Sequence, residues 1–84
     1  MTDLYDVMES ARIDAEEDIY EICEESLYAV IQHDVLGGEL VITFTDSDEL
    51  QKFVYIDENV EALEVKDWLI EQGIDSKKII LDLN

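Results

Sequence analysis

Apolar residues in the first part of the chain recur at helical spacing. Over residues 3–35 this pattern predicts one helix or two, the first of which ends near Arg12. Asp14 is the expected N-cap of the second segment, because Glu17 occupies the capping-box position three residues later. Gly37 follows the last periodic residue and suits a left-handed C-cap.

On a helical wheel, the second segment separates into an apolar side and an acidic side. The apolar side holds Ala15, Ile19, Ile22, Cys23, Leu27, Ala29 and Val30. The acidic side holds Asp14, Glu17, Asp18, Glu21, Glu24 and Glu25. The stretch 27–31 also fits a buried strand, and periodicity does not decide between helix and strand in so short a run. Residues 19–31 are therefore left open between the two.

After the glycines, the apolar period changes from helical spacing to two. Residues 40–45 alternate as a strand does, 46–49 have the composition of a turn, and 50–56 form the returning strand of a hairpin. A helix over 60–72, ended by Gly73, and a final strand over 78–83 complete the order α(α)ββαβ. The expected fold is a single small α+β domain over residues 1–84.

The expected helix 60–72 has apolar residues on two sides. One side holds Ala62, Val65, Leu69 and Trp68, and the opposite side holds Val60, Leu63 and Ile70. Such a helix is either covered on both sides or contacts another chain. This leaves open a non-inhibitory function, in which the protein is a homodimeric assembly module and its acidity serves only solubility.

Composition narrows the functional classes. The 84 residues include 23 Asp or Glu against 5 Lys or Arg, for a formal net charge of -18, yet 48% are hydrophobic. That apolar content favours a folded domain over a disordered acidic tail. Direct binding to nucleic acid or to an anionic membrane is disfavoured by the sign of the charge. A basic protein partner is favoured, and a salt-adapted composition is the alternative explanation of the acidity.

Nothing in the sequence points to export or membrane insertion. No apolar run approaches the ~18–20 residues that cross a bilayer, and the first residues lack the basic region of a signal peptide. The single cysteine, Cys23, forms no internal disulfide. We therefore expect a cytoplasmic protein, in the host cell if it is encoded by a phage.

Candidates for catalysis are few. His33 is the one histidine, and Cys23 lies on the apolar side of the wheel, where a cysteine acts as a small hydrophobe. The turn with Asp46 and Asp48 lacks the glycine and distant glutamate of an EF-hand loop, so cation binding there stays open. We expect no enzyme activity, no cofactor and no metal site.

The acidic side of the second segment is a stronger candidate. If it is helical, its six carboxylates span about 16–17 Å at ~1.5 Å per residue. That gives one charge per ~3.3 Å, close to the ~3.4 Å per charge of one DNA strand. Leu27, Val30 and Ile31 follow directly and offer apolar surface beside the charge. The pattern predicts a DNA mimic that binds the basic DNA-binding cleft of a protein.

A short motif suggests one target. Glu25-Ser26-Leu27, within Cys23-Glu24-Glu25-Ser26-Leu27 and followed by Val30 and Ile31, resembles the Glu-Ser-aliphatic element of uracil-DNA glycosylase inhibitors. Tyr55-Ile56-Asp57-Glu58-Asn59 is also similar to a segment of that family. The family comprises small acidic proteins of phages and mobile elements.

The resemblance implies an inhibitor that fills the glycosylase's DNA-binding cleft. By position, Glu25 and Ser26 take the polar contacts and Leu27 borders an apolar pocket that captures an aliphatic side chain of the enzyme. Asp57 and Glu58 join the acidic contacts. In a phage inhibitor of that family the motif lies on an edge strand. The same charge mimicry also fits other host-defence targets, such as a CRISPR effector or a restriction enzyme.

Overall fold

The described part of the chain forms eight regular elements and one short 3-10 helix. The computed structural model describes residues 4–33 and 39–82. In chain order the elements are α1 (Leu4–Ser10), β1 (Arg12–Ile13), α2 (Ile19–Glu25), β2 (Ser26–His33), β3 (Leu40–Asp46), β4 (Gln51–Ile56), α3 (Ala62–Glu71), the 3-10 helix η1 (Ser76–Lys78) and β5 (Ile79–Asp82). Within the described ranges, no helix is long and apolar enough to cross a bilayer.

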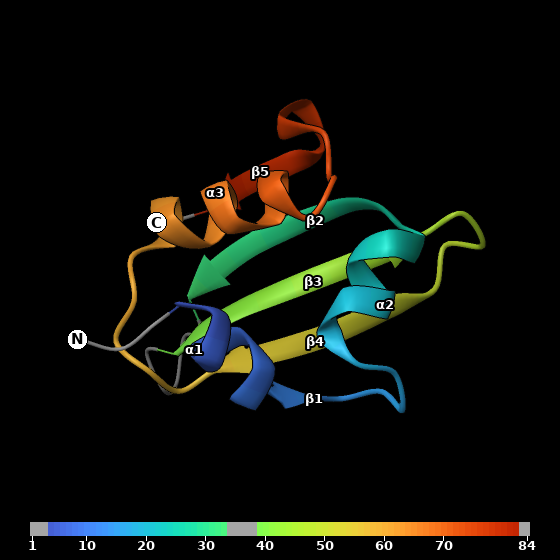
Figure 1. Cartoon of the computed structure of the whole chain (residues 1–84). Coiled ribbons are helices and arrows are strands. Elements are labelled where there is room, and N and C mark those ends of the chain that lie inside the picture. Colours follow the sequence, from blue (N-terminus) through green and yellow to red (C-terminus); the bar gives the residue numbers. More distant parts are fainter. Residues whose placement is uncertain (1–3, 34–38, 83–84) are drawn as a thin grey trace.

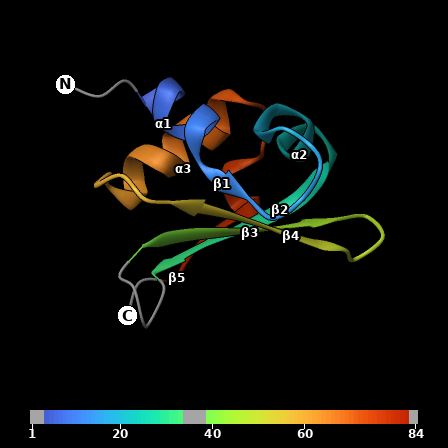
Figure 2. The same ribbon diagram turned by 90° about the horizontal axis from the view of Figure 1, so that it is seen from below.

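The five strands form one mixed sheet in the order β1-β4-β3-β2-β5 (Figure 1). Neighbouring strands are antiparallel except β2 and β5, which are parallel. The view from below shows α1, α2 and α3 on the same side of this sheet (Figure 2). The molecule is thus a two-layer α+β single domain, which confirms the expected fold class.

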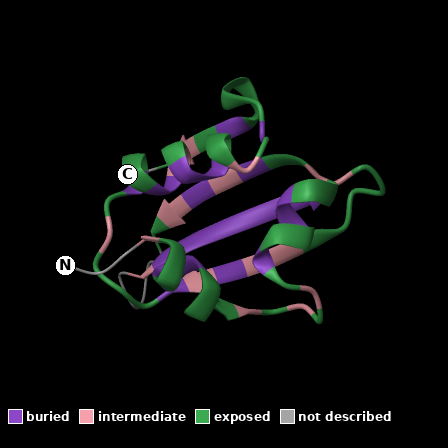
Figure 3. Ribbon diagram, in the orientation of Figure 1, coloured by how far each residue is buried: buried purple, intermediate pink, exposed green. Residues whose placement is uncertain are grey.

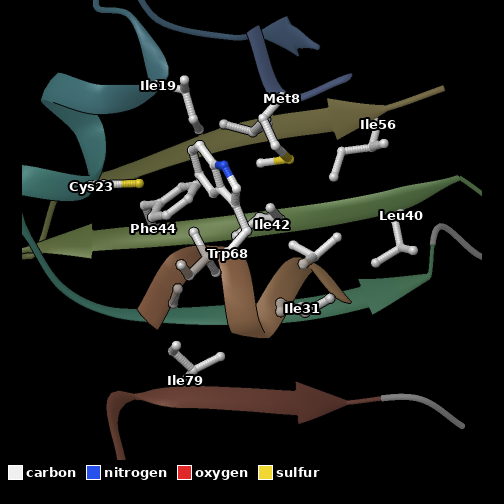
Figure 4. Close-up of a cluster of buried hydrophobic side chains, with 14 of the residues drawn as sticks. Met8, Ile19, Cys23, Ile31, Leu40, Ile42, Phe44, Ile56, Trp68 and Ile79 are labelled. Carbon is white, nitrogen blue, oxygen red and sulfur yellow. The ribbon is translucent and has the colours of Figure 1, made fainter. Parts of the chain in front are cut away.

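The core lies between the helices and the sheet. Trp68 of α3 is buried over Ile42 and Phe44 of β3, with Met8 and Ile19 from the other two helices beside it (Figure 4). Along β3, these core residues alternate with residues that point to the opposite side of the sheet. The outward sides of the helices are exposed (Figure 3).

The boundary between α2 and β2 corrects the expected long helix. The helix ends at Glu25, where the Ser26 hydroxyl donates to the carbonyl of Ile22. Residues 26–33 are strand, paired with β3 from Ser26 to His33. The stretch 27–31 is rich in aromatic and β-branched residues, which pack well in a strand between two others. The buried-strand alternative was therefore the right one for 27–31, and the helix was right for 19–25.

The start of α2 also differs from the prediction. Its N-cap is Asp18, whose carboxylate accepts from the Glu21 N–H at 2.9 Å. Asp14 instead lies in the segment before the helix, and its N–H donates to the carbonyl of Phe53 at 2.9 Å. Asp18 and Glu21 have the same spacing as the predicted pair, and the first buried residue, Ile19, follows Asp18 directly.

The second half of the chain follows the prediction closely. The expected hairpin is β3 and β4, the expected helix is α3, and the final strand is β5. Gly73 has a φ of 106°, a conformation that glycine adopts without strain, and the chain leaves the helix there. The proposed cap Gly37 lies outside the described residues.

Candidate functional site

The three helices carry a large excess of negative charge. Their exposed carboxylates, which we call the acidic helix layer, are Asp6, Glu9, Glu21, Glu24, Glu25, Glu64, Asp67 and Glu71. Lys66 is the one basic residue on these helices. The strands, in contrast, carry two basic residues, Arg12 and Lys52, and two acidic ones, Asp46 and Asp82. The helices are thus strongly acidic and lie on one side of the sheet (Figure 2), whereas the strands carry no net charge and eleven further described carboxylates lie in the connecting segments.

The predicted row of six carboxylates on one helix is wrong. Only Glu21, Glu24 and Glu25 belong to α2, while Asp14 and Glu17 lie in the segment before it. The helix starts late because residues 14–18 hold one apolar residue, Ala15, and so bury little surface. The acidic side is therefore built from three short helices rather than from one continuous stripe.

Two of the predicted site carboxylates bind a lysine of the same chain. Lys52 Nζ lies 2.9 Å from both oxygens of Glu17 and 3.0 Å from Glu25 Oε2. The hydrogen bond that Lys52 donates lowers the pKa of Glu25, and the hydrogen bonds that Lys52 donates to Glu17 and Glu25 raise its own pKa. This Lys52 cluster ties the segment before α2 and the end of α2 to β4.

The Glu-Ser-Leu motif spans the junction of α2 and β2. Glu25 contacts Lys52 and the Ser26 hydroxyl contacts the Ile22 carbonyl, so both polar members have partners within the chain. Leu27 is the exposed member, with 54% of its surface accessible. Glu25 is the last residue of α2, and Ser26 and Leu27 begin β2, which is an interior strand of the sheet and not an edge strand.

The predicted apolar patch is divided between surfaces. Ile31 is fully buried in the core, whereas Val30 points to the other side of the sheet and Leu27 lies at a register shift near the start of β2. Strand alternation is the reason, because neighbouring residues of a strand face opposite sides. Only Leu27 adjoins the acidic helix layer, two residues after Glu25.

Asp57 and Glu58 lie apart from the other predicted carboxylates. They follow Ile56 at the end of β4, whereas Lys52 and its cluster lie near the beginning of that strand. With His33, Glu39 and neighbouring residues they line a pocket of about 200 Å³. The structure therefore divides the predicted acidic contacts between two ends of the molecule.

The remaining candidates are placed as follows. Cys23 is buried in the core, and burial raises its thiol pKa to about 12, which keeps it neutral at physiological pH. His33 is exposed at the end of β2. The Asp46 carboxylate accepts from the backbone N–H of Asp48 and of Leu50, at 2.9 and 3.0 Å, and so organises the β3–β4 turn.

The sequence analysis missed one surface, the open side of the sheet. Residues in register with Val41 and Thr43 face away from the helices, and no described element covers them (Figure 2). We call these residues the sheet face: Tyr28, Val30, Val41, Thr43, Phe53, Tyr55 and Ile80. The signal was available, because strands that are apolar on both sides need cover on both sides, and the expected helices suffice for one.

Comparisons with known proteins add no relative. The sequence matches no protein-family model and no curated protein, and the structure matches no solved structure.

Proposed function

We propose that this protein inhibits a DNA-binding protein by presenting negative charge in the place of DNA. The observation that carries the proposal is the acidic helix layer, in which eight exposed carboxylates lie on one side of the sheet and the helices themselves carry one basic residue, Lys66. A basic cleft that accepts the phosphate backbone of DNA attracts such a surface. The proposed place of action is the cytoplasm of the cell that contains the target.

Charge and apolar surface meet at one point of this layer. Leu27 is exposed two residues after Glu25, beside the end of α2. Charges at the edge of an interface mainly speed association, whereas a buried apolar anchor slows dissociation. We therefore assign Leu27 as the anchor and the helix carboxylates as the groups that steer the protein into the cleft.

Uracil-DNA glycosylase is the proposed target, on the resemblance of the Glu25-Ser26-Leu27 motif to its inhibitors. The test is a uracil-excision assay with purified glycosylase and increasing amounts of this protein. We expect excision to stop once the protein is in molar excess. Full activity at a several-fold excess would contradict this target.

Two variants and a control locate the contact. Glu21→Gln with Glu24→Gln should weaken inhibition about tenfold, mainly through slower association. Asp48→Asn with Glu49→Gln removes the same charge from the β3–β4 turn and should leave inhibition nearly unchanged. Leu27→Asp adds a negative charge but should weaken inhibition, because the anchor is lost.

The hydrogen bonds that the Glu-Ser-Leu motif forms within its own chain favour a second class of target. Glu25 and Ser26 already form hydrogen bonds within the chain, which favours recognition through charge over recognition through the motif's own polar contacts. Such mimicry suits any basic DNA-binding cleft, including that of a CRISPR effector or a restriction enzyme. If glycosylase stays active, competition between this protein and DNA for those enzymes identifies the alternative.

A further inference from the structure

The sheet face is an apolar surface on an otherwise highly charged protein. The strands carry no net charge, and most of the side chains that face away from the helices are aromatic, β-branched or aliphatic. Gln32 and Gln51 are polar exceptions on the same side. Ile80 and Tyr28 are 51% and 40% exposed, whereas Val41 and Thr43 in the middle of the face are 7% and 9% exposed. Burial of such a surface is favourable in proportion to the apolar area removed from water.

One charged residue lies at each edge of this face, and both lie at the same position along the strand direction. The strand register aligns Arg12, Tyr55, Val41, Gln32 and Asp82 in one row that crosses all five strands. Arg12 lies on β1 at one edge of the sheet, where its guanidinium lies 4.1 Å from the ring centre of Tyr55 and 3.8 Å from a Glu39 carboxylate oxygen. Its side chain is still 64% exposed, so it can meet a further carboxylate. Asp82 lies on β5 at the other edge.

When two copies of this row are stacked with opposite strand order, a positive charge of each copy faces a negative charge of the other. A two-fold axis parallel to the strands, between two stacked sheet faces, reverses the strand order of the second copy. It therefore brings Arg12 of each copy over Asp82 of the other. A two-fold axis perpendicular to the strands stacks β1 on β1 instead and brings the arginines toward each other. We propose that the sheet face binds a second copy of this chain, in a symmetric dimer with its axis parallel to the strands.

The acidic helix layers do not oppose this arrangement. Stacked sheets lie about 10 Å apart, and the helices add about 10 Å on each outer side, which places the two layers about 30 Å apart. The Debye length is about 10 Å at 0.1 M salt, so most of the repulsion between the layers is screened. A dimer through α3 lacks this advantage, because exposed Leu63 lies among the carboxylates of the helix layer.

The area is sufficient for a specific dimer. The five strands are two to eight residues long and hold 27 residues in all. At about 3.3 Å per residue and a strand spacing of about 4.8 Å, they give a face of about 430 Å². With side-chain relief, two such faces bury on the order of 1,000 Å², the lower range of specific interfaces. We therefore expect a dimer that dissociates on dilution in the micromolar range. Its outer surfaces are the two acidic helix layers, which both remain free to bind a basic partner.

The first test is the mass of the protein in solution, measured by sedimentation at about 0.1 M salt, where charge is screened as described above. We expect it to rise from 9.7 kDa toward twice that value as the concentration increases. Ile80→Lys on the sheet face should abolish the rise, with the circular dichroism spectrum showing that the fold is kept. The matched control Leu63→Lys, on the outer side of α3, should leave it unchanged. A mass of 9.7 kDa at every concentration, or loss of the dimer with Leu63→Lys alone, overturns the proposal.

The second test is a charge exchange between copies. Arg12→Asp alone and Asp82→Arg alone place like charges opposite each other in the proposed dimer, so each variant should dimerise at least tenfold more weakly. An equal mixture of the two restores both pairs and should recover dimerisation. Mixing cannot restore a contact of Arg12 or Asp82 within one chain, so recovery shows that the two residues meet between copies. If the mixture does not dimerise, the proposed axis is wrong. The proposal is also overturned if this protein stays monomeric and its sheet face instead binds a different protein from a cell lysate.

Discussion

Lys52 connects three parts of the chain through one ammonium group. It lies on β4 and points to the helix side, where Glu17 and Glu25 bind it from before and after α2. Its side chain is largely buried, and so the pairing is less screened by solvent than an ordinary surface pair. Without the lysine, two carboxylates remain close together with no positive charge between them.

Replacing Lys52 with methionine should lower the melting temperature by several degrees near neutral pH. The pKa of Glu25 is lowered in the folded state, so its contribution is present above its ordinary value of 4.5 and is lost as the pH falls through the folded value. The pKa of Lys52 is raised, so its contribution is present below 10.5 and is lost as the pH rises through the folded value. The difference between variant and wild type should therefore be largest between pH 4.5 and 10.5 and should shrink below and above that range.

Thermal unfolding followed by circular dichroism across this pH range measures the effect. Lys66→Met is the matched control, because it removes the same charge from α3, where Lys66 makes no ion pair with any described residue. A pH-independent difference for Lys52→Met, or an equal loss in the control, would show that the cluster does not stabilise the fold.

For single residues, the sequence predicts which side chains are buried better than it predicts which charged side chains form ion pairs. The wheel of residues 60–72 placed Ala62, Val65, Trp68 and Leu69 on one side, and all four are buried. The ion pair of Lys52 with Glu17 joins residues 35 positions apart, and an acidic chain offers too many carboxylates for spacing to select one. Tertiary structure decides which of them the lysine meets.

Among the elements, the junction of α2 and β2 shows where local pattern is insufficient. Residues 19–31 contain apolar positions that suit a helix and a strand alike, and no glycine or proline separates the two. The helix ends because residues 26–33 pair with β3 on one side and β5 on the other. The hairpin and α3 were predicted correctly because a turn and a glycine mark their ends.

The β3–β4 turn depends on one carboxylate. Asp46→Ala removes the acceptor for two backbone N–H groups, of Asp48 and Leu50. We expect a loss of about 1–2 kcal/mol, or roughly 4–8 °C in melting temperature per kcal/mol for a domain of this size.

Two comparisons separate the hydrogen bonds from the charge. Asp46→Asn keeps an acceptor oxygen and loses the charge, and should be close to wild type. Asp48→Ala loses a charge from the same turn and should also be nearly neutral. If Asp46→Asn is as unstable as Asp46→Ala, charge rather than hydrogen bonding is the cause.

For the molecule as a whole, the dominant quantity is the net charge of -18. The folded chain measures 33 by 25 by 25 Å, comparable with the Debye length of about 30 Å at 0.01 M salt. At low salt nearly every carboxylate therefore repels every other, whereas at 1 M, with a Debye length of about 3 Å, only direct neighbours interact.

The melting temperature should therefore rise as sodium chloride increases from about 0.01 M to 1 M, because the range of repulsion contracts. Potassium chloride at the same concentrations is the control and should give the same curve, because screening depends on ionic strength and not on the identity of the cation. A melting temperature that is flat or falls with salt would show that self-repulsion is not a significant cost to this fold.

The site as a whole was only partly predictable. Net charge indicates a basic partner, but not that the carboxylates gather on three helices on one side of the sheet. The sheet face was not predicted at all, because strand order and the placement of helices decide which apolar residues remain uncovered. Neither is encoded in the spacing of residues along one strand.

The parallel pairing of β2 and β5 has a consequence for the order of folding. The meander of β2, β3 and β4 lies within residues 26–56 and closes through short connections, whereas Ala29 pairs with Ile79, fifty residues further on. Contacts at such separation form late, because long loops must close first. During synthesis, one edge of β2 therefore has unpaired backbone groups until the last strand has been made. Faulty association between nascent chains is to be expected at this edge, and its rate depends on how fast α3 and β5 dock.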